Sequence, residues 1–391
     1  CVCVSGGVPL TIPFIQAALQ RGIPLSNDSQ IFLEACPAQV IGITGSSGKT
    51  TTTALVGLMA QKYFEMKQNG HRAWVGGNIG NPLIEQVDQI DEDDLVVLEL
   101  SSFQLELMTR SPQIAAILNI TPNHLDRHGS MQAYIAAKSR ILRFQHAGDV
   151  AILNRDDPGS WSLAEHLKSD LISFGFQKPD SKQNGTYIYK DAIWLQLGRE
   201  SLKMLPLEWI QLPGRHNIAN VLAACAIAAA ASLALPAIQT AIEEFTGIPH
   251  RLEFIRNING ADWYNDSIAT APERTMAAIE AFEGPLVLLL GGRDKNLPWD
   301  DLAQLIHQRV RAVVLFGEAA GLIEKALGAV KKGETLQVIS RCNTLEEAVQ
   351  AAAKLAQPGD TVLLSPGCTS FDAFKDFEER GEYFRKLVNA L

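Results

Sequence analysis

The segment Ile41-Gly-Ile-Thr-Gly-Ser-Ser-Gly-Lys-Thr-Thr-Thr-Thr53 constrains the fold of this chain more than any other segment. An apolar run that ends at Ile43 is followed by a loop of small residues, a lysine and a threonine series that opens a helical pattern. This order places backbone N–H groups and a helix N-terminus around an anion, and Lys49 adds a positive charge. The segment therefore predicts a strand, a phosphate-binding loop and a helix.

The same segment indicates which phosphate compound is bound. Thr50 directly follows the lysine, so its hydroxyl can bind a magnesium ion that bridges the phosphates. The spacing between Gly45 and Gly48 is shorter than in the usual nucleotide loop, which indicates a particular subset of ATP users. The alternative is an ordinary glycine–serine turn before a helix. The residues that we expect to bind ATP here are Gly45, Ser46, Ser47, Gly48, Lys49, Thr50 and Thr51.

Length and composition limit the class of protein. A chain of 391 residues is too long for one core, so two or three domains are expected. The net charge of −9 argues against nucleic acid or an anionic membrane as the main partner. Six cysteines without metal-ligand spacing support neither a disulfide framework nor a zinc site, so the cytoplasm is the expected location, with Cys1 and Cys3 buried. The most apolar stretch, Ile218 to Leu235, is mostly alanine and predicts a core helix rather than a membrane span.

The order of apolar segments predicts an α/β fold. From Val40 onward, short strands alternate with helical segments, which indicates a mainly parallel, doubly wound sheet covered on both faces. The segment Thr186 to Leu197 alternates apolar and polar residues and predicts an antiparallel hairpin at a sheet edge. The other predicted strands are Leu95 to Leu98, Ile114 to Leu118, Val150 to Leu153, Leu171 to Phe174, Leu286 to Leu290, Ala312 to Phe316, Gln337 to Ile339 and Thr361 to Leu364.

Changes in composition along the chain suggest three domains. Glycine and proline at 245–250 indicate a boundary, beyond which a second doubly wound unit follows. The expected domains are residues 1–37, 38–247 and 248–391. The first is too short for its own core. Because the chain starts at Cys1 within an apparent strand, we expect it to be the last part of a larger N-terminal domain.

Polar residues at predicted strand ends are the candidates for chemistry. Glu99 ends an apolar strand, where α/β sheets bind ligands, so it is a predicted magnesium ligand, with a capping role as the alternative. His124 lies in a polar loop after the next strand and suits a metal or a phosphate, whereas His128 in the same loop is the weaker candidate. Lys138, by sequence alone, is a solvated helix lysine.

Further polar segments lie near the second half of the chain. His216, Asn217 and Asn220 cluster at the start of the alanine-rich helix, where a nucleotide could be received and where capping alone would explain Asn217. The segment Ser365 to Asp372 carries small hydroxyl residues at a helix start, which suits a carboxylate ligand.

Together these segments closely resemble the Mur ligase family of peptidoglycan synthesis. The GSSGKTTT loop, Asn123-His-Leu-Asp126 and His250-Arg251 are shared by all Mur ligases and by folylpolyglutamate synthetase. The combination of Leu98 to Glu106, Gly76 to Gly80 and Ser365 to Asp372 is most similar to the members that join D-glutamate to UDP-N-acetylmuramoyl-L-alanine. The resemblance implies an ATP-dependent amide ligase with a three-domain architecture, a central phosphate-loop domain and a C-terminal Rossmann-like domain.

The resemblance also implies roles for individual residues. Two magnesium ions would be held by Thr50, Glu99, His124 and Lys138, the last as a carbamate formed with carbon dioxide. The catalytic residues would be Lys49, Glu99, His124 and Lys138. The nucleotide would also be held by Asn217, Asn220, Arg251 and Asp266. The acid substrate would be bound by Ser5, Gly7, Asn78, Ser101, Ser102 and Gln104, and D-glutamate by Thr270, Lys295, Ser370 and Phe377.

The chain departs from the family pattern in two ways, and two other functions remain as alternatives. Ile268 stands where the family's most familiar form has a lysine, so one positive contact to the nucleotide is absent, and Arg293 or Lys295 could compensate. Only the last βα portion of the uridine-binding domain is expected, with Ser5 to Val8 as the remnant of its loop. The alternatives are a folylpolyglutamate synthetase-like ligase and a non-catalytic nucleotide-binding relative. The family expectation for the assembly is a monomer that binds small molecules and neither nucleic acid nor a membrane.

Overall fold

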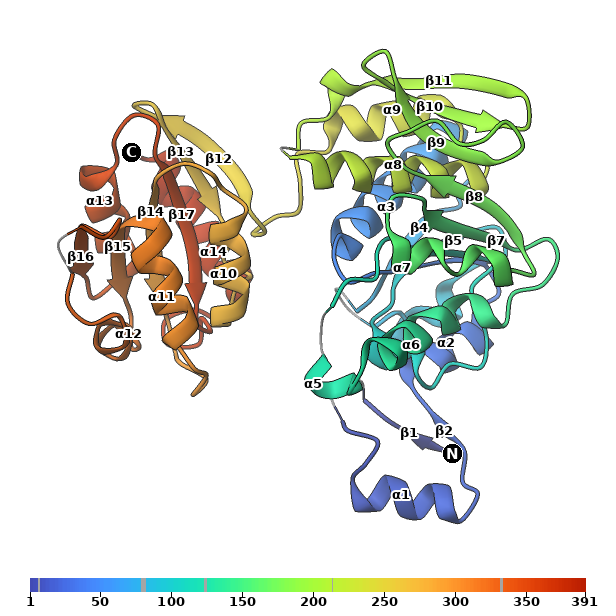
Figure 1. The fold of residues 1–391 in the computed structure, drawn as a ribbon, viewed down its shortest axis with the longest axis horizontal. Helices are drawn as coiled ribbons and strands as arrows, with labels where there is room; N and C mark the ends of the chain where they lie inside the picture. The colour runs from blue at the N-terminus through green and yellow to red at the C-terminus, as the bar shows by residue number, and fades with distance from the viewer. Residues whose placement is uncertain (6–7, 79–81, 123–124, 213, 331–332) are drawn as a thin grey trace. The chain divides into compact units, whose positions relative to one another are not determined.

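The computed structural model describes residues 1–5, 8–78, 82–122, 125–212, 214–330 and 333–391, apart from the side chains of Leu125 and Asp126. The chain divides into two compact units, Cys1–Phe245 and Thr246–Leu391 (Figure 1). The division into three domains expected from the sequence stays a prediction. The α/β fold class is confirmed, because both units are built on sheets that are mainly parallel.

The first unit is built on a nine-stranded sheet with the order β11-β10-β9-β8-β7-β6-β3-β5-β4. The strands of this sheet are β3 (Gln39–Thr44), β4 (Ala73–Gly77), β5 (Leu95–Glu99), β6 (Ile114–Ile117), β7 (Val150–Asn154), β8 (Asp170–Phe174), β9 (Asn184–Tyr189), β10 (Ala192–Leu197) and β11 (Glu200–Pro206). Strands β1 (Val2–Cys3) and β2 (Leu25–Ser26) form a separate parallel pair. Its helices are α1 (Pro13–Gln20), α2 (Asp28–Ala35), α3 (Lys49–Lys67), α4 (Ser102–Leu105), α5 (Leu125–His128), α6 (Met131–Arg143), α7 (Pro158–Trp161), α8 (Arg215–Ala230) and α9 (Leu235–Glu244), with short 3-10 turns at Leu83–Gln89, Ala164–His166 and Leu207–Trp209.

The strand order changes direction at β3, which carries the phosphate loop at its carboxyl end. Strands β5 and β6 flank β3, and all three run parallel. Their carboxyl ends therefore meet at one edge of the sheet, beside the loop. In open α/β sheets this edge is where ligands bind.

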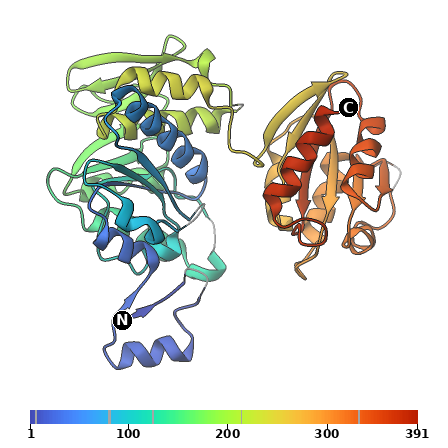
Figure 2. The ribbon, with the colours of Figure 1, turned by 180° about the vertical axis from the view of Figure 1, so that it is seen from behind.

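Apolar side chains alternate between the two faces of these strands, so both faces are covered. On one face, Val96, Leu98 and Ile117 pack with residues of α2, α4 and α6. On the other face α3 contacts β3, β4 and β5, and it packs beside α8 and α9 (Figure 2). The phosphate-loop helix is thus held between the sheet and two further helices.

The edge hairpin predicted from alternating residues is confirmed. Strands β9 and β10 pair antiparallel and β11 continues the edge, whereas β3 to β9 pair in parallel. The alanine-rich segment does form a buried helix, but α8 begins at Arg215 and ends at Ala230, before the predicted end at Leu235. The backbone turns at Ser232, whose φ is 55°, and α9 then starts at Leu235.

The expectation that Cys1 and Cys3 are buried is wrong. Both residues are exposed, because β1 is a two-residue strand that pairs only with β2. Of the described cysteines, Cys225 and Cys368 are buried, and no disulfide joins any of the six.

The second unit contains a six-stranded sheet with the order β12-β13-β17-β14-β15-β16, in which only β12 and β13 pair antiparallel. One face carries α10, α11 and α12, and the other carries α13 and α14, each with its own apolar core. The strands are β12 (Glu253–Ile258), β13 (Ala261–Asn265), β14 (Leu286–Gly291), β15 (Val310–Phe316), β16 (Val338–Arg341) and β17 (Thr361–Gly367). The helices are α10 (Pro272–Glu280), α11 (Asp300–Arg309), α12 (Ala320–Leu327), α13 (Leu345–Leu355) and α14 (Phe377–Asn389).

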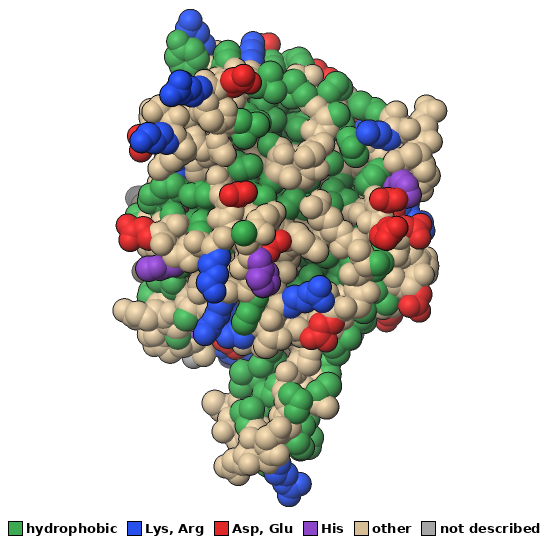
Figure 3. Space-filling model, turned by 90° about the vertical axis from the view of Figure 1, so that its right-hand side faces the viewer, with side chains coloured by type: hydrophobic (Ala, Val, Ile, Leu, Met, Phe, Trp, Pro, Cys, Tyr) green, Lys and Arg blue, Asp and Glu red, His purple; other side chains and the backbone are tan. Residues whose placement is uncertain are grey.

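Positive and negative side chains are mixed on one face of the molecule. Figure 3 shows acidic and basic side chains interspersed with apolar and neutral ones over the face that it presents. Within the described parts of the chain, no helix has both the length and the apolar character needed to cross a membrane.

Candidate active site

The phosphate loop connects β3 to α3, as predicted. Gly48 precedes the first residue of α3 and has a φ of 80°, a conformation that glycine adopts without strain. The Lys49 Nζ donates a hydrogen bond to the Gly45 carbonyl at 3.0 Å, so its charge lies over the loop. Thr50 and Thr51 follow in the first turn of α3. The loop therefore offers an ammonium group and a helix N-terminus to an anion.

Asn119, just beyond the end of β6, holds this loop in place. The Ser47 N–H donates to Asn119 Oδ1 at 2.9 Å, and Asn119 Nδ2 donates to the Ser47 carbonyl at 3.1 Å. The Ser46 N–H donates to the Asn119 carbonyl at 2.9 Å. The Ser46 hydroxyl lies 3.1 Å from the Tyr134 hydroxyl. Asn119 and Tyr134 are not predicted from the sequence, because neither stands in a nucleotide motif and only the tertiary fold brings them to the loop.

Glu99 occupies the predicted position at the carboxyl end of β5. Its side chain is 2% exposed, and Asn78 Nδ2 donates to Oε1 at 3.0 Å. The buried Oε2 atom has no hydrogen-bond partner within the described residues. A buried carboxylate oxygen without a donor fits a hard cation such as magnesium, which prefers oxygen ligands.

Lys138 is buried, contrary to the prediction of a solvated helix lysine. The residue lies on α6 and is 1% exposed, because α6 packs on the sheet beneath the loop. Its Nζ donates to the Gly45 carbonyl at 2.8 Å and lies 4.8 Å from the centroid of the Tyr134 ring. Burial, reinforced by the charge of Lys49, lowers the pKa of Lys138 to about 7. The resemblance to the family implies a role for this residue, whereas the residue pattern alone does not predict one.

The start of α8 lies against the phosphate loop. A Cβ atom at Gly48 would lie 2.3 Å from Asn220 Oδ1, so the two residues are in close contact. Asn220 Nδ2 donates to Asn217 Oδ1 at 3.2 Å. The structure therefore brings the predicted nucleotide residues Asn217 and Asn220 to the loop that Lys49 follows.

The predicted acid-substrate residues of the first unit lie around α4. Ser101 is the N-cap of α4 and forms a reciprocal capping box with Gln104. Gln104 Nε2 donates to the Ser29 hydroxyl at 2.9 Å, and its Oε1 accepts from the Ser101 N–H at 2.9 Å. The amide of Gln104 is thus engaged between α2 and α4, while Asn78 is exposed.

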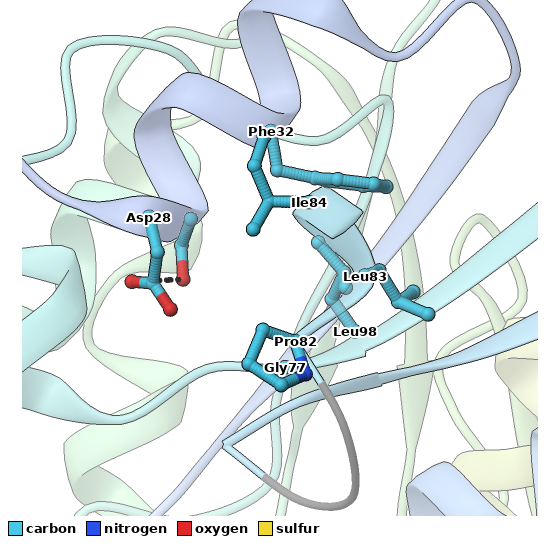
Figure 4. A pocket seen from close by; sticks show the side chains of 8 residues that line it. Asp28, Phe32, Gly77, Pro82, Leu83, Ile84 and Leu98 are labelled. Atoms are coloured by element: carbon cyan, nitrogen blue, oxygen red, sulfur yellow. Dashed lines mark hydrogen bonds between the residues drawn. The ribbon is translucent and has the colours of Figure 1, made fainter. Parts of the chain in front are cut away.

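A small pocket adjoins these residues. Figure 4 shows apolar side chains of α2, β5 and the 3-10 turn facing the carboxylate of Asp28 across it. Gly77, next to Asn78, forms part of the wall. Ser5 is exposed in the N-terminal segment, and the predicted residues Gly7 and His124 lie outside the described residues.

In the second unit, the predicted residues lie at the carboxyl ends of β13, β14 and β17. Asp266 follows β13 and accepts hydrogen bonds from the Leu252 N–H at 3.2 Å and the Ser365 hydroxyl at 2.8 Å. Burial raises the pKa of the Asp266 carboxyl to about 7, although these donors and the charge of Arg251 oppose the shift. Arg251 itself is exposed.

The predicted amino-acid residues surround the same edge of this sheet. Lys295 is exposed, and its Nζ lies 3.4 Å from the Thr270 hydroxyl. Ser370 is buried in the loop after β17, and Phe377 begins α14. Phe377 is also tied to the β13 loop, because its carbonyl accepts from the Ser267 hydroxyl at 2.8 Å.

Ile268 lacks the positive charge of a lysine, and Arg293 and Lys295 are the two residues expected to compensate for it. Arg293 forms a two-pronged ion pair with Glu318 at 2.9 and 3.0 Å, so its charge is already matched. Arg274, which the sequence pattern does not single out, donates to the Ile268 carbonyl at 3.3 Å, and its charge helps to oppose the pKa rise of Asp266.

Comparison with known protein families agrees with this geometry. The Mur ligase middle domain matches residues 43–228, and the Mur ligase glutamate ligase domain matches residues 250–368. A UDP-N-acetylmuramoylalanine--D-glutamate ligase of Symbiobacterium thermophilum is 44% identical over 100% of this chain and 84% of its own length. This chain belongs to the Mur ligase family. A protein of the same name from Acetivibrio thermocellus is 40% identical, over 98% of this chain and 81% of its own length. The resemblance to the D-glutamate-adding members is therefore confirmed.

Solved structures of Mur ligases share the fold. MurF from Acinetobacter baumannii has a TM-score of 0.59 and 22% identity, covering 92% of this chain and 78% of that protein. MurC from Thermotoga maritima has a TM-score of 0.56 and 18% identity, covering 98% of this chain and 84% of that protein. These proteins share the Mur ligase architecture with this chain.

Proposed function

We propose that this chain joins D-glutamate to UDP-N-acetylmuramoyl-L-alanine with ATP, through an acyl phosphate. The observation that carries the proposal is the 44% identity, over the whole chain, to a ligase named for these two substrates. The phosphate loop with Lys49 and the buried Glu99 supports ATP as the source of energy. The chemistry belongs to cell-wall precursor synthesis, for which the cytoplasm and a monomer are the expected setting.

In the first step the free carboxylate of the L-alanyl group attacks the γ-phosphorus of ATP, giving an acyl phosphate and ADP. We propose that Gly45 to Thr51 hold the phosphates through backbone N–H groups, and that Lys49 neutralises negative charge on the transferring group. Asn217 and Asn220, which lie against the loop, are the proposed nucleotide contacts of α8.

Two magnesium ions are the implied metals. The Oε2 of Glu99, which has no hydrogen-bond partner in the described part of the chain, fits one of them. The proposed ligands are Thr50, Glu99, His124 and Lys138 as a carbamate. Bound magnesium would neutralise phosphate charge in the transition state. For the carbamate, the neutral amine of Lys138 reacts with carbon dioxide and releases one proton. A pKa of about 7 leaves a substantial fraction of this amine neutral at physiological pH, which supports the modification.

In the second step the amine of D-glutamate attacks the acyl carbon, and the tetrahedral intermediate expels phosphate to leave the amide. The proposed D-glutamate residues are Thr270, Lys295, Ser370 and Phe377. Lys295 and Thr270 supply a positive charge and a hydroxyl, which suit a carboxylate. Arg251 and Asp266 are the proposed nucleotide contacts of the second unit.

The residues that the family resemblance implies for the acid substrate are Ser5, Gly7, Asn78, Ser101, Ser102 and Gln104. Among the described members of this set, Asn78 and Gln104 differ in their geometry. Asn78 is exposed and orients Glu99, so it can meet both substrate and metal ligand. The amide of Gln104 is occupied by Ser29 and Ser101, so we assign it to holding α4 in place.

The test is phosphate release from ATP in the presence of UDP-N-acetylmuramoyl-L-alanine. The reaction is run with D-glutamate, with L-glutamate and without an amino acid. We expect release that requires D-glutamate. Release with folate substrates and L-glutamate instead would support the folylpolyglutamate synthetase-like alternative. No release with any acceptor would contradict the ligase function of this chain.

A further inference from the structure

His128 ends the single turn of α5 and has no role in the reaction proposed above. Its side chain is only 1% exposed. The imidazole is stacked parallel to the Phe103 ring, with centroids 5.2 Å apart and planes within 1°. On its other side the ring lies 5.0 Å from that of Tyr134, tilted by 53°. His128 is therefore enclosed between α4 and α6.

Both ring nitrogens of His128 face residues of α4 or its C-cap. Nδ1 lies 3.0 Å from Glu106 Oε1, and Nε2 lies 3.0 Å from the Ser102 hydroxyl. A carboxylate oxygen only accepts, so Nδ1 carries the hydrogen. In the neutral ring Nε2 is then an acceptor, and the Ser102 hydroxyl donates to it. Glu106, His128 and Ser102 form a hydrogen-bonded chain that spans α4 from its first residue to its C-cap.

Helix α4 is short, and its position matters for the acid substrate. It follows the end of β5 at Glu99, and its N-cap Ser101 and its first residue Ser102 are two of the proposed substrate contacts. One turn of helix has little intrinsic stability, so its place depends on tertiary contacts. A Ser102 hydroxyl whose proton is held by His128 can accept a hydrogen bond from a ligand but has no proton left to donate.

Tyr134, which packs against His128, also links this histidine to the phosphate loop. The Tyr134 hydroxyl lies 3.1 Å from the Ser46 hydroxyl, and the Lys138 ammonium lies over the Tyr134 ring. His128 thus packs between the helix assigned to the acid substrate and the residue that contacts the loop and the lysine.

We propose that His128 is a positioning residue for the acid substrate, which it serves by holding both ends of α4 through Ser102 and Glu106. The inference rests on the proposed ligase function, because α4 is assigned to the acid substrate of that reaction. It predicts an effect on binding of UDP-N-acetylmuramoyl-L-alanine and no direct effect on ATP or D-glutamate.

The variant His128→Phe keeps the ring between Phe103 and Tyr134 but removes both nitrogens. We expect its KM for UDP-N-acetylmuramoyl-L-alanine to rise about 10-fold, with the KM for ATP and D-glutamate within about twofold of the wild type. Ser102→Ala removes the other partner, so the double variant should be no worse than the worse single variant. The matched control is His146→Phe, at a side chain that is 86% exposed, which should leave all three constants unchanged.

Equal increases in all three KM values, or losses that add in the double variant, would overturn the proposal. Glu106→Gln keeps an acceptor oxygen while removing the charge and serves as a milder variant if His128→Phe does not fold. It should raise the same KM by a smaller factor.

A second readout does not depend on activity. Nitrogen-15 labelling of histidine reports which ring nitrogen carries hydrogen, and the His128 signals are those missing from His128→Phe. We expect a protonated Nδ1 and an unprotonated Nε2, and hydrogen on Nε2 alone would overturn the hydrogen-bonded chain. Absence of D-glutamate-dependent phosphate release by the wild type would instead contradict the proposed function, and the ring signals would still decide the geometry at His128.

Discussion

At the scale of single residues, Lys49 is the clearest test of the phosphate loop. Its Nζ reaches the Gly45 carbonyl and brings a positive charge to the loop. We expect Lys49→Ala to lower kcat by at least ~100-fold, because a charge at the transferring phosphoryl group is lost. Steady-state phosphate release measures this. Lys67→Ala, at the exposed far end of the same helix, should behave as the wild type. Near-normal turnover of Lys49→Ala would contradict the phosphate-loop assignment.

Lys138 allows the carbamate to be tested by chemical rescue. We expect Lys138→Ala to lose most of its ligase activity and to regain part of it with short-chain carboxylic acids. The reason is that the vacated space beside the Gly45 carbonyl could admit a small carboxylate in place of the carbamate. The rate is measured with and without the acid, and Lys168→Ala, an exposed lysine of the same unit, should show no response to acid. A folded Lys138→Ala variant that is never rescued would count against the carbamate.

Asp266 predicts a pH dependence of stability. Its folded-state pKa is raised from 3.8 to about 7. The folded state therefore binds more protons than the unfolded state between these pH values, and the free energy of unfolding falls as pH rises through this range. An asparagine at this position does not titrate, so its free energy of unfolding does not fall in this way. Relative to the wild type, Asp266→Asn should therefore gain up to about 1.4 kcal/mol per pH unit from pH 5 to 7.

Denaturant unfolding of the wild type and Asp266→Asn at several pH values measures this difference. Asp262→Asn, at a half-buried carboxylate in the strand that precedes Asp266, is the control. A stability difference that stays constant from pH 5 to 8 would show that Asp266 does not titrate in this range.

Some site residues were accessible to sequence reasoning and others were not. Glu99 was predicted because an acidic residue at the end of an apolar strand implies a position at the carboxyl edge of a parallel sheet. Lys138 looked solvated because neighbouring Ala136, Ser139 and Arg140 give no sign that this face of α6 packs under the loop. Asn119 and Tyr134 could not be found, since their contacts with the loop depend on how β6 and α6 lie beside β3.

At the scale of elements, the end of β6 sets the shape of the loop between β3 and α3. Asn119 pairs with both the N–H and the carbonyl of Ser47, as a backbone strand would. We expect Asn119→Ala to weaken ATP binding about 10-fold, because the loop loses its fixed conformation. Asn119→Asp should weaken it at least as much, since it replaces the donor by a negative charge near the phosphates.

Isothermal titration with ATP measures both affinities. Asn69→Ala is the matched control, because the side chain of Asn69 also accepts from a backbone N–H, but in an exposed turn after α3. Unchanged ATP affinity in Asn119→Ala would show that the loop keeps its conformation without this clamp.

Most elements were predictable because their apolar patterns were strong. The runs at Leu286 to Leu290 and Thr361 to Leu364 became buried central strands of the second sheet. The antiparallel edge strand β12 is not predicted from the sequence, because half of its residues are polar and its pairing with β13 depends on the rest of the sheet. The end of α8 was misjudged because its alanine pattern runs past the turn at Ser232 without a glycine or proline.

At the scale of the whole molecule, each unit has its own apolar core. Residues of α10 to α12 fill one face of the second sheet, and residues of α13 and α14 fill the other. We therefore expect the segment Thr246–Leu391 to fold alone and to unfold cooperatively. Thermal denaturation followed by circular dichroism, together with dispersed amide NMR signals, tests this expectation. A segment without a cooperative transition would show that its core needs the first unit.

The boundary near Phe245 was predicted from glycine and proline alone, since the helix before it ends where the composition changes. Whether residues 1–37 form a domain distinct from the rest of the first unit stays a prediction. The segment is tied to the larger unit through α2, whose Asn27 cap donates to the Gln104 carbonyl, a contact that composition does not reveal.

The contact between Gly48 and Asn220 limits how such a chain can diverge over generations. No side chain fits at position 48, where the backbone is left-handed and Asn220 Oδ1 fills the space a Cβ would take. A bulkier residue at position 220 would press on the glycine from the other side. The two positions, one in a loop and one in a distant helix, share a single small volume. A lineage that enlarges either residue therefore loses the fit of its phosphate loop.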